Sequence, residues 1–286
     1  MPFNTEDEIA LVGAGAMGAP IVRHLVGAGF PVVACDLDAG RRARAEELGA
    51  RSTSTVDDLG SCRVALVMVP TDDDVMLVAG QYGEVAPEDS ALVIHSSVQT
   101  ATCLAVEEAL RDSGVRVLDA ALTGGVRGAE AGRVNLLVGG RAQDVADLQP
   151  VFAPWTSHVN HLGDLGAGQV GKTVNNLVHW AQIVALAEAL SLGAELGVPP
   201  TVLRPALQNG PTDSRTLREL EEMRFTWYEK DIDNAVKMAA TVDRELVLSP
   251  FVRRLMRDID VPAMAALLED RGIIELSGTP DAAAKA

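Results

Sequence analysis

Short runs of β-branched and aliphatic residues alternate with helical stretches from residue 8 to about residue 162. This alternation predicts successive strand–helix–strand units, whose strands pair in a mostly parallel sheet. We therefore expect an α/β fold with a doubly wound sheet in this part of the chain. The expected strands are residues 8–12, 31–35, 64–69, 91–95, 115–118, 134–138 and 156–162.

After Gly163 the strand signals stop, and every later periodic stretch is helical. The chain has 286 residues, more than one compact domain usually holds, so we expect two domains. The first spans residues 1–164, and the second is an all-helical domain over residues 165–286, built on a long interdomain helix. The expected helices are residues 168–197, 201–208, 212–223, 230–248 and 251–270.

The composition argues against polyanionic partners. A net charge of −16 repels nucleic acid and anionic membranes, so we expect neither as a partner. Cys35, Cys62 and Cys103 are odd in number and lack metal-ligand spacing, which argues against disulfides and a metal site. The acidic N-terminus has no signal-peptide pattern, and polar residues such as His179 interrupt the apolar helix after residue 172, against a membrane span. We expect a cytoplasmic protein.

Three glycines, Gly13, Gly15 and Gly18, follow the first expected strand directly and open a helix. The first permits the turn, the second lets the backbone approach a pyrophosphate, and the third lets the helix pack against the strand. The helix N-terminus then faces the phosphates. A glycine-rich turn without a ligand is the less favoured alternative. We predict a Rossmann-type domain that binds a dinucleotide at Gly13, Ala14, Gly15, Ala16, Met17 and Gly18.

Asp36 ends the second expected strand, about 20 residues beyond the glycines, where a carboxylate accepts hydrogen bonds from the adenosine ribose. The same carboxylate repels a 2′-phosphate, which favours NAD as the cofactor. NADP stays possible, because Arg41 and Arg42 follow one turn later. Asp38 is expected to cap the next helix.

Loops at the carboxyl ends of the later strands are expected to border the cofactor, because open α/β sheets bind ligands along that edge. This places Val69 and Pro70 after the third expected strand, and Ser96 and Ser97 after the fourth, among the candidate contacts. For the two serines, a helix cap or a turn is an equal alternative.

Lys172, Asn175 and Asn176 stand at positions i, i+3 and i+4 just after the glycine-rich turn. A helix that begins there projects one cation and two amides onto neighbouring parts of one face. Because the helix continues as an apolar run, we expect it to be largely buried. From this segment alone, a lysine that reaches solvent and a lysine that transfers protons are equally acceptable interpretations.

The glycine fingerprint, the segment Asp119–Gly125, the Lys172/Asn176 segment and Lys230-Asp231 together resemble the β-hydroxyacid dehydrogenase family. The resemblance covers essentially the whole chain and is specific for the family, but weak for the substrate. It implies an NAD(P)-dependent oxidoreductase that interconverts a small β-hydroxy acid and its semialdehyde or keto acid, with both ligands in the cleft between the domains.

The resemblance also implies roles for individual residues. Thr123, Gly124 and Gly125 bind the substrate carboxylate, and backbone N–H groups of two successive glycines suit an anion. Lys172 is the general acid or base, and Asn176, with Asn175 beside it, orients the substrate or the lysine. Lys230 lies near the nicotinamide, and Asp231 caps or pairs locally.

Two residues depart from the family pattern. Arg127 follows the glycine pair, where it binds a second anionic group of the substrate or points into solvent. His179 returns to the face of Lys172, where it contacts the substrate or, as the favoured alternative, makes its hydrogen bonds within a helix interface. His158 and His161 have odd spacing on a strand and therefore lie on opposite faces, which argues against a metal site.

Three alternative functions are less favoured. An imine reductase typically replaces the lysine, and 6-phosphogluconate dehydrogenase resembles a longer chain. A redox sensor that binds the dinucleotide without turnover has no need of Lys172 or Asn176. The apolar residues on nearly all sides of the long helix favour a homodimer or homotetramer.

Overall fold

The computed structural model describes residues 2–277. By its internal contacts the chain divides into two compact units, Met1–Lys172 and Thr173–Ala286. The division falls inside one helix, α7 (Ala167–Glu195). The two units are described in turn.

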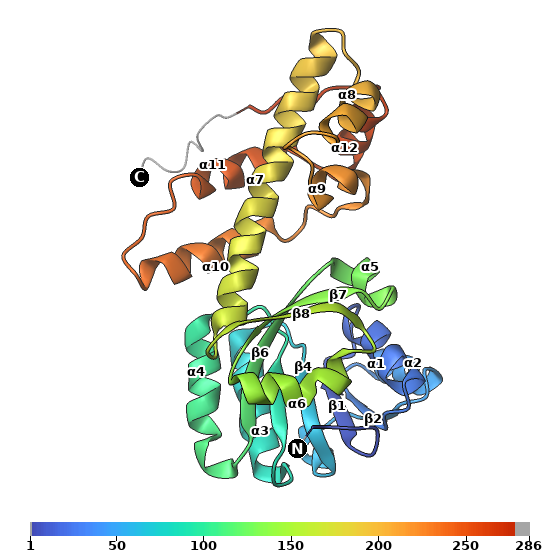
Figure 1. Ribbon diagram of the computed structural model, residues 1–286, viewed down its shortest axis with the longest axis vertical. Helices are drawn as coiled ribbons and strands as arrows, with labels where there is room; N and C mark the ends of the chain where they lie inside the picture. Colours follow the sequence, from blue (N-terminus) through green and yellow to red (C-terminus); the bar gives the residue numbers. More distant parts are fainter. Residues whose placement is uncertain (1, 278–286) are drawn as a thin grey trace. The chain divides into compact units, whose positions relative to one another are not determined.

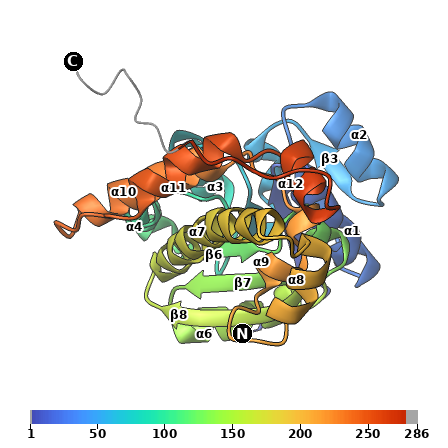
Figure 2. The same ribbon diagram turned by 90° about the horizontal axis from the view of Figure 1, so that it is seen from above.

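The first unit is built on an eight-stranded sheet with the order β3-β2-β1-β4-β5-β6-β7-β8. β1 to β6 are parallel, β7 is antiparallel to β6, and β8 is parallel to β7. Figure 2 shows β6, β7 and β8 side by side in the ribbon. The strand order reverses direction at β1/β4, which confirms the predicted doubly wound sheet. The strands are β1 (Glu8–Val12), β2 (Val32–Cys35), β3 (Arg51–Thr53), β4 (Cys62–Val67), β5 (Ala91–Ile94), β6 (Arg116–Thr123), β7 (Val134–Gly139) and β8 (Thr156–Gly163).

Helices cover both faces of this sheet (Figure 1). The central strands are buried on both faces, which explains why they read as continuous apolar runs. One face packs against α1 (Gly18–Gly27), α2 (Ala39–Glu47) and α6 (Ala142–Phe152), and the other against α3 (Asp72–Val85) and α4 (Thr100–Ala109). The short helix α5 (Gly125–Glu130) joins β6 to β7, and single 3-10 turns lie at η1 (Val56–Leu59) and η2 (Arg111–Ser113).

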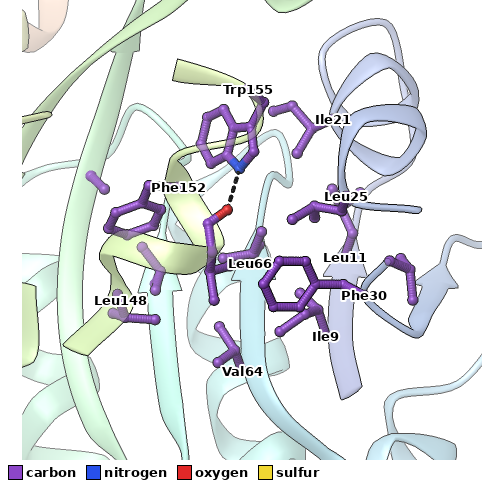
Figure 3. Close-up of a cluster of buried hydrophobic side chains, with 14 of the residues drawn as sticks. Ile9, Leu11, Ile21, Leu25, Phe30, Val64, Leu66, Leu148, Phe152 and Trp155 are labelled. Atoms are coloured by element: carbon purple, nitrogen blue, oxygen red, sulfur yellow. Dashed lines mark hydrogen bonds between the residues drawn. The ribbon is translucent and has the colours of Figure 1, made fainter. Parts of the chain in front are cut away.

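Figure 3 shows the core on the face of α1 and α6. Side chains from α1 and α6 belong to one cluster over the central strands, and the buried Trp155 donates from Nε1 to Val151 O at 2.8 Å. The indole therefore lies in the core without an unsatisfied N–H group. The labelled residues are Ile9, Leu11, Ile21, Leu25, Phe30, Val64, Leu66, Leu148, Phe152 and Trp155.

The sheet differs from the sequence prediction at three places. β3 was not predicted, because its three residues, Arg51–Thr53, are polar and partly exposed at the sheet edge. β7 runs antiparallel, a direction that its apolar sequence does not encode. β6 continues to Thr123 instead of ending at Leu118, because the added residues pair with β7.

The second unit is entirely helical within the described residues, as predicted. Three expected helices are shorter or divided. The stretch 212–223 holds only α9 and η3, the stretch 230–248 ends at Ala240, and the stretch 251–270 is divided where Asp260 caps a new helix that carries Pro262 in its first turn. The helices are α7, α8 (Pro200–Leu207), α9 (Arg215–Arg218), η3 (Leu220–Glu222), α10 (Tyr228–Ala240), α11 (Ser249–Leu255), η4 (Met256–Asp258) and α12 (Val261–Leu268).

α7 is long and apolar enough to cross a membrane by length and composition alone, and no other described helix is. A core helix of a soluble protein passes the same test. In the second unit one face of α7 contributes Trp180, Ile183 and Leu190 to the hydrophobic core. Val174 and Val178 are more than half exposed, so the expected burial of this helix is met on one face only.

Candidate active site

The predicted glycine turn connects β1 to α1. Gly13 has a φ of +98°, and a Cβ atom there would lie 2.3 Å from Met68 O. A Cβ atom at Gly18 would lie 2.3 Å from Gly13 O, so neither position accommodates a side chain. At Gly15 the nearest atom to such a Cβ is Arg41 Nη1 at 3.8 Å. The turn is therefore closed around its first and third glycines and open at its second, as a pyrophosphate requires.

Asp36 fixes this turn from the end of β2. Its Oδ2 accepts a hydrogen bond from Ala14 N at 2.9 Å, and its Oδ1 accepts one from Asp38 N at 2.9 Å. Arg41 Nη1 lies 3.5 Å from the same carboxylate. Asp38 caps α2 by accepting from Arg41 N at 2.8 Å, which confirms the predicted N-cap. Asp36 thus holds the glycine turn as well as standing at the predicted ribose position.

The other candidate cofactor contacts of this unit lie at the same sheet edge. Ala16 is exposed and Met17 half-buried in the glycine turn, while Val69, Pro70 and Ser97 follow β4 and β5. Ser96 joins these two loops, because Val69 N donates to its Oγ at 2.9 Å and this Oγ donates to Val69 O at 2.8 Å. Parallel pairing of β1, β2, β4 and β5 brings their carboxyl ends together, so the loops suit a dinucleotide.

Thr123, Gly124 and Gly125 lie where β6 passes into α5. Both glycines have positive φ angles, +107° and +59°, which favour glycine. Apart from its neighbours in the chain, no atom of residues 2–277 lies within 4 Å of a Cβ built at Gly125. The backbone is therefore open at this point, as an anion site requires. Arg127 is exposed in α5.

A polar chain crosses the three strands beside this turn, and sequence reasoning missed it. Asn135 Nδ2 donates to Thr123 Oγ1 at 2.9 Å, and Asn160 Nδ2 donates to Asn135 Oδ1 at 2.7 Å. The signal was present, because Asn135 interrupts the apolar strand β7. Thr123 is thus held by a side chain from the neighbouring strand.

Lys172 lies in α7, and its Nζ donates to Leu122 O at 2.8 Å. Leu122 directly precedes Thr123 in β6. The lysine is half-buried and is therefore not a freely solvated surface cation. Within the first unit, the structure brings the candidate proton donor next to the candidate carboxylate site.

The start of α7 is held by two buried residues whose roles were not predicted. Asp119 Oδ1 accepts from Gly166 N at 2.6 Å, and its Oδ2 accepts from Gln169 N at 2.7 Å. Gln169 Nε2 donates to Ser96 O at 3.0 Å, and its Oε1 accepts from Val98 N at 3.2 Å. Burial raises the pKa of Asp119, against the opposing effect of these N–H donors. These bonds fix the helix that carries Lys172 to β6 and β5.

The remaining candidates belong to the second unit. Asn176 is buried, and its Oδ1 accepts from Asn175 Nδ2 at 3.1 Å. His179 Nδ1 lies 2.9 Å from Thr216 Oγ1, the contact expected of a histidine in a helix interface. Its substrate contact, like the nicotinamide contact of Lys230, stays a prediction.

Asp231 pairs across the helices of the second unit. Its Oδ2 accepts from Trp180 Nε1 at 3.0 Å, which links the first turn of α10 to α7. The same bond orients the helix start that carries Lys230.

Comparison with known families covers nearly all of the described chain. Residues 8–163 match the NAD binding domain of 6-phosphogluconate dehydrogenase. Residues 166–271 match the family described as NAD-binding of NADP-dependent 3-hydroxyisobutyrate dehydrogenase. The two matches meet at the glycine-rich turn that precedes α7.

Individual proteins agree with these matches. The chain is 34% identical over 205 residues to 3-hydroxyisobutyrate dehydrogenase of Pseudomonas aeruginosa, covering 70% of this chain and 69% of that protein. It is 31% identical over 201 residues to 2-(hydroxymethyl)glutarate dehydrogenase of Eubacterium barkeri, covering 69% and 67%. The fold resembles that of 3-hydroxyisobutyrate dehydrogenase from Mycobacterium tuberculosis, solved with L-serine, with a TM-score of 0.79, 24% identity and coverage of 95% and 97%. The chain therefore belongs to the β-hydroxyacid dehydrogenase family and is an NAD(P)-dependent dehydrogenase that acts on CH–OH groups.

Proposed function

We propose that the protein oxidises a small β-hydroxy acid reversibly to its semialdehyde or keto acid, with Lys172 as general base in oxidation and general acid in reduction. The observation that carries this proposal is the position of Lys172 Nζ, which lies 2.8 Å from Leu122 O. Leu122 is the residue directly before Thr123. A proton-transfer group beside an anion site suits a substrate that carries a hydroxyl close to a carboxylate.

Each group has a separate task in this proposal. Backbone N–H groups of Gly124 and Gly125, with the Thr123 hydroxyl, bind the carboxylate. Lys172 accepts the hydroxyl proton, and Asn176 orients the substrate or the lysine. The nicotinamide cofactor, when bound, accepts the hydride. Proton transfer from a positioned side chain contributes roughly 10²- to 10⁴-fold to the rate.

The names of the relatives support a small hydroxy acid as the substrate, because one is a dehydrogenase of 3-hydroxyisobutyrate and another of 2-(hydroxymethyl)glutarate. We propose Arg127 as the residue that meets a second anionic group where the substrate has one. A cytoplasmic location and a homo-oligomer remain predictions of the sequence.

The test is the absorbance of reduced nicotinamide over time, with NAD or NADP and a panel of short β-hydroxy acids. We expect Lys172→Ala to lower kcat by at least about 100-fold while the enzyme still binds NADH in a fluorescence titration. Lys237→Ala, which removes an exposed lysine of α10, is the matched control and keeps wild-type turnover. Tight cofactor binding without turnover of any hydroxy acid contradicts the proposal and favours a dinucleotide-binding sensor.

A further inference from the structure

Resting on the proposed function, we propose that Asn135 is a positioning residue that makes the Thr123 hydroxyl a hydrogen-bond donor to the substrate carboxylate. The two residues are direct partners in the antiparallel ladder of β6 and β7, at the last pair before Gly124. Asn135 is half-buried in a strand of otherwise aliphatic residues and glycine. An amide at this position therefore serves something other than strand packing.

The orientation of the amides follows from an acceptor that cannot donate. Asn160 Nδ2 donates to Leu136 O at 3.0 Å, and a backbone carbonyl only accepts. The amide nitrogen of Asn160 must therefore face β7, where it also donates to Asn135 Oδ1 at 2.7 Å. This leaves Asn135 Nδ2, and not its oxygen, directed at Thr123 Oγ1 at 2.9 Å.

These hydrogen bonds determine whether the Thr123 hydroxyl donates or accepts. Because its oxygen accepts from Asn135 Nδ2, the hydroxyl proton must be directed elsewhere. Among the described residues, an acceptor for this proton is Asn135 O, at 3.4 Å, which is beyond the usual length of an O–H···O bond. A carboxylate offers a shorter, charge-assisted bond and replaces this contact readily.

The deciding variant is Asn135→Asp, which keeps the shape of the side chain. It reverses the direction of the hydrogen bond to Thr123 Oγ1, because an aspartate oxygen accepts where the amide nitrogen donated. An aspartate oxygen at the place of Nδ2 accepts the Thr123 proton, while Asn160 still donates to the other oxygen. The hydroxyl then no longer donates to the substrate. We expect the KM for the hydroxy acid to rise about 10- to 100-fold, the cost of one hydrogen bond to a charged group, with kcat changed less than about threefold.

A double-mutant cycle separates this effect from the new negative charge. In a Thr123→Val background no hydroxyl remains, so Asn135→Asp should raise KM less than about threefold further. In a Thr123→Ser background, which keeps the hydroxyl, the full rise should persist. Equal rises in the Val and wild-type backgrounds would mean charge repulsion or general damage, and would overturn the proposal.

Circular dichroism establishes that each variant folds before its kinetics are measured. If Asn135→Asp does not fold, Asn135→Leu removes the same donor without a charge and goes through the same cycle. Because the Thr123 hydroxyl then loses its direction, we expect KM to rise several-fold in the wild-type background and not in the Val background. An inactive wild type refutes the proposed function, whereas an active wild type with additive effects refutes only the role of Asn135.

Discussion

The carboxylate of Asp119, in the middle of β6, accepts the backbone N–H of Gln169 in the first turn of α7 at 2.7 Å. The same side chain accepts Gly166 N at 2.6 Å. A helix start has N–H groups without partners inside the helix, and here a buried strand residue supplies the acceptor. Asp119 therefore fastens the start of the helix that carries Lys172 to β6, beside the bonds that Gln169 makes to Ser96 O and Val98 N.

Replacing Asp119 should destabilise the first unit. Asp119→Ala leaves two buried N–H groups without an acceptor, and we expect a loss of about 2–4 kcal/mol in the free energy of unfolding. Chemical denaturation measures this loss. Asp112→Ala, an exposed carboxylate in η2, is the control and should change stability by less than about 0.5 kcal/mol. Equal stability of the two variants would contradict the role of Asp119 as a cap.

His95 should make stability depend on pH in the acidic range. Its ring is buried against Phe152 and Trp155, and Nδ1 lies 2.6 Å from Ala120 O. Burial lowers the pKa of His95 from 6.5 to about 4. Between pH 4 and pH 6.5, this histidine is therefore mostly protonated in the unfolded chain and mostly neutral in the folded chain. Stability from this group is complete above pH 6.5 and declines, by about 3 kcal/mol, as the pH falls to 4.

The measurement for His95 is urea denaturation at pH 7 and at pH 4.5 for three proteins. His95→Leu should lose less stability on acidification than the wild type, since the contributions of other groups cancel in the comparison. His158→Leu, which removes an exposed histidine, should keep the wild-type dependence. A wild-type dependence in His95→Leu would show that acid destabilisation arises elsewhere.

Arg41 should govern the discrimination between NAD and NADP. At its predicted ribose position, Asp36 would disfavour a 2′-phosphate, so we expect tighter binding of NADH than of NADPH. The Arg41 guanidinium lies beside both Asp36 and the open side of Gly15, where it can pair with phosphate. Arg41→Ala should weaken NADPH binding about tenfold and NADH binding less than about threefold.

Fluorescence titration with each reduced cofactor tests this expectation for Arg41. Arg44→Ala is the control, because Arg44 pairs with Glu47 on the exposed side of the same helix. An equal loss for both cofactors would assign Arg41 to the pyrophosphate instead.

The three cysteines should be inert in the folded protein. Each is free and buried, and burial raises the pKa of Cys35 to about 11 and that of Cys62 to about 12. Burial also raises the pKa of Cys103. Because the thiolate is the reactive form, we expect negligible reaction with Ellman's reagent at pH 8 and three thiols after denaturation. Rapid native reaction of one thiol would place it at an accessible site.

Much of the first unit was predictable because local sequence encodes it. β1 matches its predicted bounds, and the strand ends at β2, β4 and β5 shift by one or two residues. The glycine turn and the Asp38 cap depend on contacts close in sequence, and both are present as expected. These features need no knowledge of distant partners.

The features that the sequence did not predict depend on contacts between residues far apart in the chain, or on where short helices end. The direction of β7 and the capping by Asp119 arise from residues far apart in sequence. The role of Asn135 was missed because its partner, Thr123, lies twelve positions away on another strand. In the second unit, the helices within residues 212–223 are short, and α10 ends at Ala240. The hydrophobic pattern of the sequence did not predict these ends.

The reversal of β7 has a consequence for how such a protein can diversify. Because β6 and β7 are neighbours joined by α5, the proposed anion-binding groups occur within the consecutive residues 116–139. The glycine turn and Asp36 belong to a separate stretch, residues 8–36. An exchange of residues 116–139 between relatives would replace the proposed carboxylate-binding residues together and would keep the glycine turn and Asp36. If these residues have the proposed roles, substitutions that change the choice of acid and substitutions that change the choice of nucleotide fall in separate stretches of the chain.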